Sequence, residues 1–350
     1  MEATLRDDRI VAGGDARQRF YDARGYGYPL GGNEIALSRV EAAHLLFRGD
    51  LNAVRIGGEG LGFKRFLERV DDTRFGALFL VYLDLRQRGF YLSPARSEWV
   101  DDPASNADFV VYKRGSGPED GAVAHQIRVV GEREPLDPPA LGECVLSVVD
   151  EESEVTYFAP ERTDPKGTTD AAIGAETVPE ATLLTDRVIC WDPPAGLYES
   201  AFYGHPLGSR DDAAASDALQ LSLLEAAQLV AAGRLRIPGG YDAVVERGRA
   251  VEGDHFDRRL QVYAALRERG IVPKTGFKFG ADFRTYDAID SVENLGHSNR
   301  LIRVLAPSTS VVPRDLSLDV RLAHGVRKDL VYAWPADDGV EFLAVSRLTP

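Results

Sequence analysis

Apolar residues in the last third of the chain form short runs that are separated by polar residues and turns. Five runs have strand composition: IVPKT (271–275), ADFRTY (281–286), RLIRVL (300–305), KDLVYAW (328–334) and VEFLAVS (340–346). Two segments, 256–269 and 314–326, have helical patterns; Gly270 ends the first, and Pro313 suits the first turn of the second. This alternation predicts a mixed sheet flanked by helices.

Two earlier segments place apolar residues at helical spacing behind a strand and a glycine-rich turn. Their apolar positions are Leu37, Val40, Leu45 and Leu46 in one, and Leu219, Leu223, Leu224 and Leu229 in the other. We expect Asn33 and Ser216 to cap these helices, and Gly49 and Gly233 to end them. Each segment therefore predicts a small α+β subdomain.

The chain repeats itself at a spacing near 180 residues. The matches are YDARGYGYPLG (21–31) with YESAFYGHPLG (198–208), LSRVEAA (37–43) with LSLLEAA (221–227), VYLDLRQRG (81–89) with VYAALRERG (262–270), and ADFVVY (107–112) with ADFRTY (281–286). Their order is conserved, and a domain-sized offset indicates a tandem duplication rather than a solenoid.

The duplication divides the chain into two copies, each with two subdomains. We expect N-terminal subdomains at 1–70 and 184–252, followed by mixed-sheet subdomains at 71–158 and 253–350. Residues 159–183 are rich in Pro, Thr, Gly, Glu and Asp without periodicity, so we interpret them as an exposed linker. The fold class is mixed α+β.

Length and hydropathy are typical of a cytoplasmic globular protein. The chain has 350 residues, 44% of them hydrophobic, which suits two or more domains. The longest apolar run (77–83) is too short to span a bilayer, and the N-terminus MEATLRDDR carries no signal pattern. Cys144 and Cys190 lack the spacing of a zinc site, so we expect two small buried hydrophobic residues and no metal.

The net charge of −14 is carried by a chain with 35 arginines and only 6 lysines. Acidic, lysine-poor composition is typical of proteins that work in molar salt, where the Debye length shrinks to about 3 Å and self-repulsion is tolerable. The alternative is an ordinary acidic protein.

Three blocks of the second copy carry a family resemblance. They are KTGFKFGADFRTY (274–286), LGHSNRLIRV (295–304) and DVRLAHGVRKDLVYA (319–333). In this order they resemble the signature of the archaeal tRNA-splicing endonucleases. The resemblance covers the whole chain, because the dimeric type of that family is also a tandem duplication of this length. It implies a Tyr–His–Lys triad, here Tyr286, His297 and Lys328, that cleaves RNA without metal or cofactor.

The same three residue types suit RNA cleavage on chemical grounds. Attack by the 2′-hydroxyl needs a base, an acid for the 5′-oxygen and a cation for the phosphorane. His297 is the best acid, because imidazole titrates near neutral pH, and Lys328 would stabilise the phosphorane. Tyr286 would be the base, although phenols ionise near pH 10 and need help from cations. Taken singly, each residue is usually structural or surface-exposed.

The first copy lacks this set. Tyr112 corresponds to Tyr286, but SPARSEWVDDPASN (93–106) replaces the KTGFKFG segment. His125 follows Tyr112 by 13 residues instead of 11, and PPALGECVLSV (138–148) replaces the helix that precedes Lys328. We therefore expect the first copy to be a degenerate, inactive nuclease-like unit.

The hairpin VLSVVDEESEVTYF (145–158) ends the first copy with an acidic tip at Asp150, Glu151, Glu152 and Glu154. The resemblance implies that this loop inserts into a basic cleft of a partner subunit and forms a homodimer. The alternative is a solvated acidic turn.

Positive charge is concentrated in the second copy. Residues 258–330 contain 13 basic and 8 acidic residues, a net of +5, against 28 − 47 = −19 for the remainder. A basic region suits phosphate binding, although high salt weakens counterion release. The resemblance implies that precursor tRNA is recognised through a bulge–helix–bulge, with two arginines stacking on a flipped base; Arg321 matches the first by context and Arg347 the second by position.

Two other functions remain open on the sequence. Mixed sheets also host metal-dependent nuclease sites, for which Asp282 and Asp287 could supply carboxylates. The chain could also be a noncatalytic RNA-binding or scaffold subunit, since some relatives are heteromeric with inert partners.

Overall fold

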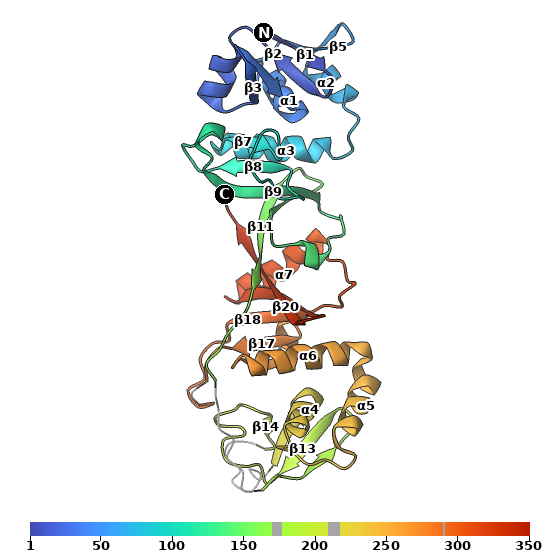
Figure 1. Cartoon of the computed structure of the whole chain (residues 1–350). Coiled ribbons are helices and arrows are strands. Elements are labelled where there is room, and N and C mark those ends of the chain that lie inside the picture. Colours follow the sequence, from blue (N-terminus) through green and yellow to red (C-terminus); the bar gives the residue numbers. More distant parts are fainter. Residues whose placement is uncertain (170–176, 209–217, 290) are drawn as a thin grey trace.

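The computed structural model describes residues 1–169, 177–208, 218–289 and 291–350. Figure 1 shows an elongated molecule in which the two copies lie end to end, with the mixed-sheet subdomains in the middle and the N-terminal subdomains at the two ends. Mixed α+β architecture and internal duplication are thereby confirmed. Among the described residues, no helix combines the length and apolar content needed to cross a membrane.

The N-terminal subdomain of the first copy is a six-stranded sheet in the order β3-β4-β2-β1-β5-β6. Its strands are β1 (Glu2–Arg6), β2 (Arg9–Ala12), β3 (Tyr28–Gly31), β4 (Glu34–Leu37), β5 (Ala53–Ile56) and β6 (Glu59–Leu61). Its helices are the short π-helix η1 (Arg17–Asp22), α1 (Arg39–Phe47) and α2 (Phe63–Arg69).

The second copy has a four-stranded counterpart in the order β12-β13-β15-β14. Its strands are β12 (Ala181–Leu183), β13 (Arg187–Trp191), β14 (His205–Pro206) and β15 (Ala218–Ser222). Its helices are α4 (Leu223–Ala231) and α5 (Gly240–Glu252).

Both predicted helix starts were placed too early. Asn33 precedes a strand, and the N-cap of α1 is Ser38, whose hydroxyl accepts the backbone N–H of Glu41. The equivalent cap of α4 is Ser222, with Glu225 completing the capping box, while Ser216 lies outside the described residues. The repeated L-S-x-x-E motif is therefore a strand end followed by a helix cap.

A single ten-stranded sheet joins the two copies, in the order β16-β17-β18-β19-β20-β11-β10-β9-β8-β7. The strands from the first copy are β7 (Leu92–Pro94), β8 (Phe109–Tyr112), β9 (Val123–Gly131), β10 (Val145–Val149) and β11 (Val155–Thr163). Those from the second are β16 (Val272–Thr275), β17 (Phe283–Tyr286), β18 (Arg300–Val304), β19 (Asp329–Ala336) and β20 (Gly339–Leu348).

The linker expected at 159–183 is shorter than predicted at both ends. Residues 159–163 extend β11, where they pair with β20, and residues 181–183 form β12. The polar composition of this segment gave no strand signal. Residues 159–163 are nevertheless in a strand, because their backbone pairs with that of β20, and this pairing does not depend on apolar side chains.

Equivalent strand pairs relate the copies by a pseudo-two-fold axis. In the first copy, Phe109 pairs with Ile127, Ile127 with Val145, and Leu146 with Phe158. The equivalent pairs of the second copy are Phe283 with Ile302, Ile302 with Val331, and Tyr332 with Leu343. Between the copies, Phe158 pairs with Arg347 and Arg162 pairs with Leu343. The axis therefore passes near the central pair, Pro160 with Val345.

Helices cover the sheet unequally in the two copies. Long helices α3 (Phe75–Gln87) and α6 (Asp254–Glu268) occupy equivalent places, whereas α7 (Pro313–Gly325) packs on the opposite face from α6. In the first copy a short 3₁₀ turn, η3 (Pro138–Ala140), replaces α7. This confirms the predicted loss. The remaining short 3₁₀ turns are η2 (Pro118–Asp120) and η4 (Phe277–Phe279).

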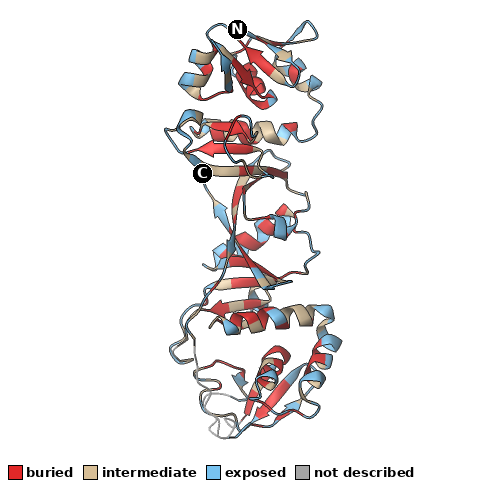
Figure 2. Cartoon of the chain, in the orientation of Figure 1, coloured by how far each residue is buried: buried red, intermediate tan, exposed pale blue. Residues whose placement is uncertain are grey.

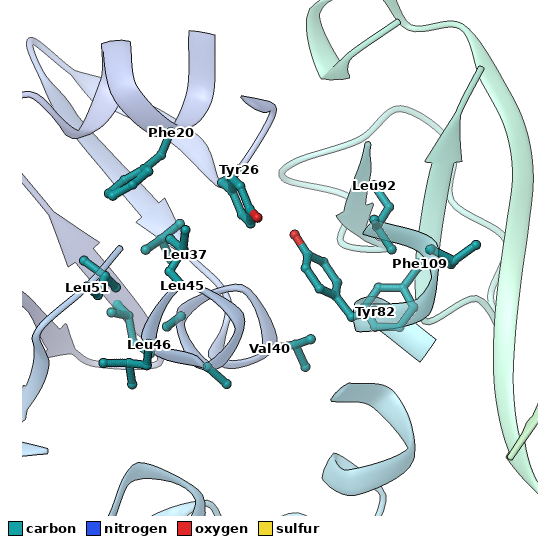
Figure 3. Packing of buried hydrophobic residues seen from close by; sticks show 14 of the residues in the cluster. Phe20, Tyr26, Leu37, Val40, Leu45, Leu46, Leu51, Tyr82, Leu92 and Phe109 are labelled. Atoms are coloured by element: carbon teal, nitrogen blue, oxygen red, sulfur yellow. The ribbon is translucent and has the colours of Figure 1, made fainter. Parts of the chain in front are cut away.

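Continuous cores tie each N-terminal subdomain to its neighbour. In Figure 3, Tyr26 and Tyr82 approach one another between the two subdomains of the first copy. A second core does the same in the second copy, and a third, beneath α7, combines residues of both copies. Figure 2 shows that the buried residues follow the sheets and the inner faces of the helices. Packed cores thus hold the strands of the ten-stranded sheet, and with them the strand ends, in place.

Candidate active site

Tyr286, His297 and Lys328 lie at one end of three neighbouring strands. Tyr286 ends β17, His297 lies in the loop before β18, and Lys328 immediately precedes β19. The backbone N–H of Asn299 donates to the carbonyl of Thr285 (2.8 Å), and that of Asp329 donates to the carbonyl of Asn299 (3.1 Å). These bonds continue the sheet register past the strand ends and bring the three predicted residues together.

The turn after α7 positions Lys328. Arg327 has φ of 56°, a left-handed conformation typical of a helix C-terminus, and the N–H of Lys328 donates to the carbonyl of Ala323 (3.0 Å). The Lys328 ammonium donates to the carbonyl of Ser298 (2.7 Å), next to His297. Partial burial and the positive charge of Arg284 lower the pKa of Lys328.

The two other members of the triad differ in exposure. The side chain of His297 is exposed to solvent, which leaves its imidazole accessible to a substrate. Tyr286 is only 5% exposed and packs among Phe202 and Val272. An exposed imidazole, a half-buried ammonium and a buried phenol thus come from neighbouring positions at one end of the sheet.

Arg284, in the ADFRTY segment (281–286), is a further candidate that the sequence did not single out. It shares a face of β17 with Tyr286, and its guanidinium carbon lies 5.8 Å from the centre of that ring. Its Nε atom is buried without a hydrogen-bond partner among the described residues, and no ion pair of Arg284 occurs there. A free guanidinium beside two triad members can bind an anion.

The two predicted RNA-binding arginines lie on different elements. Arg321 is exposed on the last turns of α7, and Arg347 is exposed near the end of β20. Arg347 lies two residues beyond Val345, the last β20 residue paired with β19 at the Lys328 end. Neither guanidinium has a polar partner among the described residues, so both are accessible.

The corresponding place in the first copy is differently built. The phenol of Tyr112 donates to the Ser93 hydroxyl (3.1 Å) and is buried. Strand register aligns Lys328 with Gly142 and aligns His125 with Arg300 rather than His297. Of the predicted triad, only the tyrosine therefore has an equivalent.

The acidic tip is a tight turn between β10 and β11. The Asp150 carboxylate accepts the backbone N–H groups of Glu152 and Glu154 (2.9 Å each), and Ser153 has φ of 65°. Glu151 pairs with Arg133, which holds the pKa of that carboxyl below its usual value. Glu152 and Glu154 remain exposed.

The carboxylates considered for a metal site have protein partners. Asp282 accepts hydrogen bonds from His255 and the Val304 backbone, and Asp287 pairs with Arg300. Over the described ranges, no three His, Cys, Asp or Glu side chains form a metal-binding group. Cys144 and Cys190 are free and buried, and burial raises the pKa of both thiols to about 11.

Two domain families match the chain. Residues 1–67 and 180–246 both match the tRNA intron endonuclease N-terminal domain, and residues 256–342 match its catalytic C-terminal domain. The second match contains Tyr286, His297 and Lys328.

Curated relatives match over their full length. The chain is 56% identical to a tRNA-splicing endonuclease of Haloarcula marismortui and 57% identical to one of Halobacterium salinarum, with 100% of each chain covered. It is 36% identical to the tRNA-splicing endonuclease of Methanosarcina mazei, with 99% of each chain covered. The first two come from halophiles, as the acidic composition predicted.

Proposed function

The chain belongs to the tRNA intron endonuclease family, and from this premise we propose that it cuts precursor RNA at both splice sites of a bulge–helix–bulge without a metal ion. The observation that carries the proposal is the convergence of Tyr286, His297 and Lys328 at one sheet end of the second copy. A tRNA-splicing endonuclease function is also what its full-length relatives are named for.

The proposed reaction is an internal transesterification. Tyr286 accepts the proton of the 2′-hydroxyl, whose oxygen attacks the adjacent phosphorus. The bond from phosphorus to the 5′-oxygen breaks, and His297 donates a proton to that leaving oxygen. The products are a 2′,3′-cyclic phosphate and a 5′-hydroxyl.

Cations beside Tyr286 would stabilise the charge that develops in this reaction. The Lys328 ammonium is held by a single carbonyl, so two of its protons remain for phosphate oxygens. Its charged form is disfavoured by partial burial and by Arg284, and an incoming phosphate would offset both effects. Lys328 therefore suits stabilisation of the phosphorane.

RNA would be held largely by contacts that survive high salt. We assign Arg321 and Arg347 to stacking on a flipped base, because both guanidinium groups are exposed and unpaired among the described residues. The net +5 of residues 258–330 favours phosphate, but molar salt removes most of the gain from counterion release.

We further propose that the acidic tip of one chain docks on the second copy of another chain. A cavity of about 430 Å³ between the two subdomains of the second copy is lined by Arg187, Arg259, Lys274 and Arg284. The first three already have carboxylate partners, so among the described lining residues Arg284 is the cation that Glu152 or Glu154 would meet. Two chains would then present two cutting sites to an RNA with two bulges.

One assay tests the cleavage proposal. The purified protein is incubated with a bulge–helix–bulge RNA in molar KCl with excess EDTA, and the termini of the products are mapped. We expect two cuts that leave 2′,3′-cyclic phosphate and 5′-hydroxyl ends. Cleavage only with added metal would favour a metal-dependent nuclease, and binding without cleavage would favour a scaffold role; either result overturns the proposal.

A further inference from the structure

Phe202 has a strained backbone beside the proposed catalytic tyrosine. Its φ is 53°, in the left-handed region that bulky residues rarely occupy. The other non-glycine residues with positive φ in the described ranges are Asp7, Asp102, Ser153, Asp192 and Arg327. An aromatic residue held in this conformation is a candidate for a functional role, because such strain persists only where its surroundings enforce it.

The first copy has glycine at the same place. Gly25 occupies the position of Phe202 in the repeated turn, with nearly the same φ of 61°. A Cβ on Gly25 would lie 3.1 Å from side-chain atoms of Tyr91 and Pro118. The backbone of the turn is therefore common to both copies, and the aromatic ring is an addition of the second copy.

That ring packs against Tyr286. The two ring centres lie 5.8 Å apart at 63°, an edge-to-face contact, and the two residues are 6% and 5% exposed. On the other side, the Lys274 ammonium lies 4.6 Å from the centre of the Phe202 ring. Phe202 thus forms a wall between a buried cation and the catalytic phenol.

Buried polar groups hold the backbone of Phe202 in place. The Lys274 ammonium donates to the carbonyl of Phe202 (3.2 Å) and to the carboxylate of Glu225 (2.6 Å). Arg267 donates to the carbonyl of Ala201 (2.8 Å). Since Glu225 lies on α4 and Lys274 on β16, these bonds fix a loop of the N-terminal subdomain to the edge of the catalytic sheet.

In the first copy, the equivalent tyrosine, Tyr112, is contacted by residues of its own sheet subdomain rather than by that loop. Strand register places Ser93 at the position of Lys274, and there the Ser93 hydroxyl accepts the phenol of Tyr112. It also places Tyr91 at the position of Val272, so the ring near the phenol comes from the sheet subdomain itself. The phenol of Tyr286, by contrast, has no hydrogen-bond partner among the described residues.

We propose that Phe202 is a positioning residue, supplied by the N-terminal subdomain of the second copy, that holds the ring of Tyr286 in the orientation required for cleavage. The inference rests on the proposed function, since it needs Tyr286 to act in the reaction. It assigns to the N-terminal subdomain a direct part in preparing the site.

The first test is the Phe202→Gly variant of the full chain, which installs the residue that the first copy uses at this φ. Single-turnover cleavage of a bulge–helix–bulge RNA should slow by about 10- to 100-fold, as expected when a reacting group is misplaced. Binding of the same RNA with a 2′-deoxy nucleotide at each cut should be unchanged. Phe202→Leu, which keeps apolar volume, should lose less activity.

The duplication supplies a rescue and a matched control. Adding Val272→Tyr to Phe202→Gly provides a ring from the edge strand, as Tyr91 does in the first copy, and should restore part of the rate. Tyr91→Val makes an equivalent deletion in the inert copy and should leave cleavage unchanged. If loss of activity merely followed loss of stability, the added tyrosine would not restore the rate, and Tyr91→Val would also lower it.

The outcomes separate this inference from the proposed function. A normal rate for Phe202→Gly, together with loss of cleavage in Tyr286→Phe, overturns the positioning role alone. A normal rate for Tyr286→Phe overturns the proposed role of Tyr286 itself. Weaker RNA binding by Phe202→Gly, or absence of rescue in a folded double variant, would assign Phe202 a different role and also overturn the inference.

Discussion

Replacing Lys274 by methionine tests whether the buried ion pair of the second copy stabilises the fold. The Lys274 ammonium lies 2.6 Å from the Glu225 carboxylate, and the two side chains are 13% and 7% exposed. Methionine has a similar volume, so the substitution removes a charge without leaving a large cavity. The expected effect therefore comes mainly from the unpaired Glu225, with a smaller part from the carbonyls of Phe202 and Gly204, which also lose the lysine as a donor.

Removal of one partner from a buried pair typically costs about 3–5 kcal/mol of unfolding free energy at neutral pH. Glu225 keeps the backbone N–H groups of Gly204 and Ser222 as donors. In the first copy, Glu41 is buried with the equivalent donors and no lysine, which shows that such a site folds. We therefore expect the lower end of this range, about 3 kcal/mol.

The pH dependence follows from the two glutamates. Burial alone would raise the pKa of Glu225, but the Lys274 ammonium and the hydrogen bonds to the carboxylate hold that pKa below its usual value. The pair therefore contributes stability above the unfolded pKa, and this is lost as pH falls through the folded value. Without the lysine, burial should raise the pKa of Glu225, as it does for Glu41. The variant then carries its full penalty above that raised pKa and recovers as Glu225 takes up a proton, so the difference from wild type shrinks with falling pH.

Urea unfolding in molar KCl at pH 7 and pH 5, followed by circular dichroism, measures this difference. Ser93→Ala, at the equivalent position of the first copy, is the matched control. It removes the acceptor of the buried Tyr112 phenol and should cost about 1–3 kcal/mol, equally at both pH values, because no charge is left unpaired. Adding Glu225→Gln to Lys274→Met should recover part of the loss, because no charge is then buried. A cost below about 1 kcal/mol, typical of solvated pairs, or one that is equal at both pH values, would refute the argument.

Three further predictions concern activity, assembly and salt. Lys328→Ala should reduce the cleavage rate by about 100-fold or more, whereas Tyr112→Phe in the inert copy should not; equal rates for Lys328→Ala and wild type would contradict its role. If the tip holds the proposed dimer together, light scattering should find the wild type as a dimer and the Glu152→Lys, Glu154→Lys variant as a monomer with lower activity; a dimer in both would contradict docking by the tip. The melting temperature should rise steeply between low salt and molar KCl, and equal values would contradict salt adaptation.

The strands and the last helix of the second copy were predictable because the signals that define them lie within each element. The strand runs at 271–346 and the helix before Lys328 lie within a few residues of their predicted limits. The two early helices were misplaced because Leu37 and Leu219 suit a helix face as well as a strand. The S-x-x-E capping box, present in both LSRVEAA and LSLLEAA, was the signal that would have placed Ser38 and Ser222 correctly.

Features that depend on pairing across the sheet were beyond the sequence. Residues 159–163 read as linker because nothing local indicates that β11 will be paired on both sides. The ion pair of Lys274 with Glu225 joins residues 49 positions apart. The positive φ of Phe202 is a conformation that an aromatic residue rarely adopts, so the sequence gives no sign of it. Such local contradictions occur where tertiary structure overrides propensity, and here they lie beside the proposed site.

The pairing of β11 with β20 gives the first copy a structural role that requires no catalytic residue. Without the strands of the first copy, β20 would be an exposed edge of the sheet, and the core beneath α7 would lose Leu146 of β10 and Phe158 of β11. The first copy can therefore lack the lysine-bearing helix and bond its phenol to Ser93 while still completing the sheet and the core of the second copy. The first copy thus supports the second through paired strands and shared core residues, which require no triad.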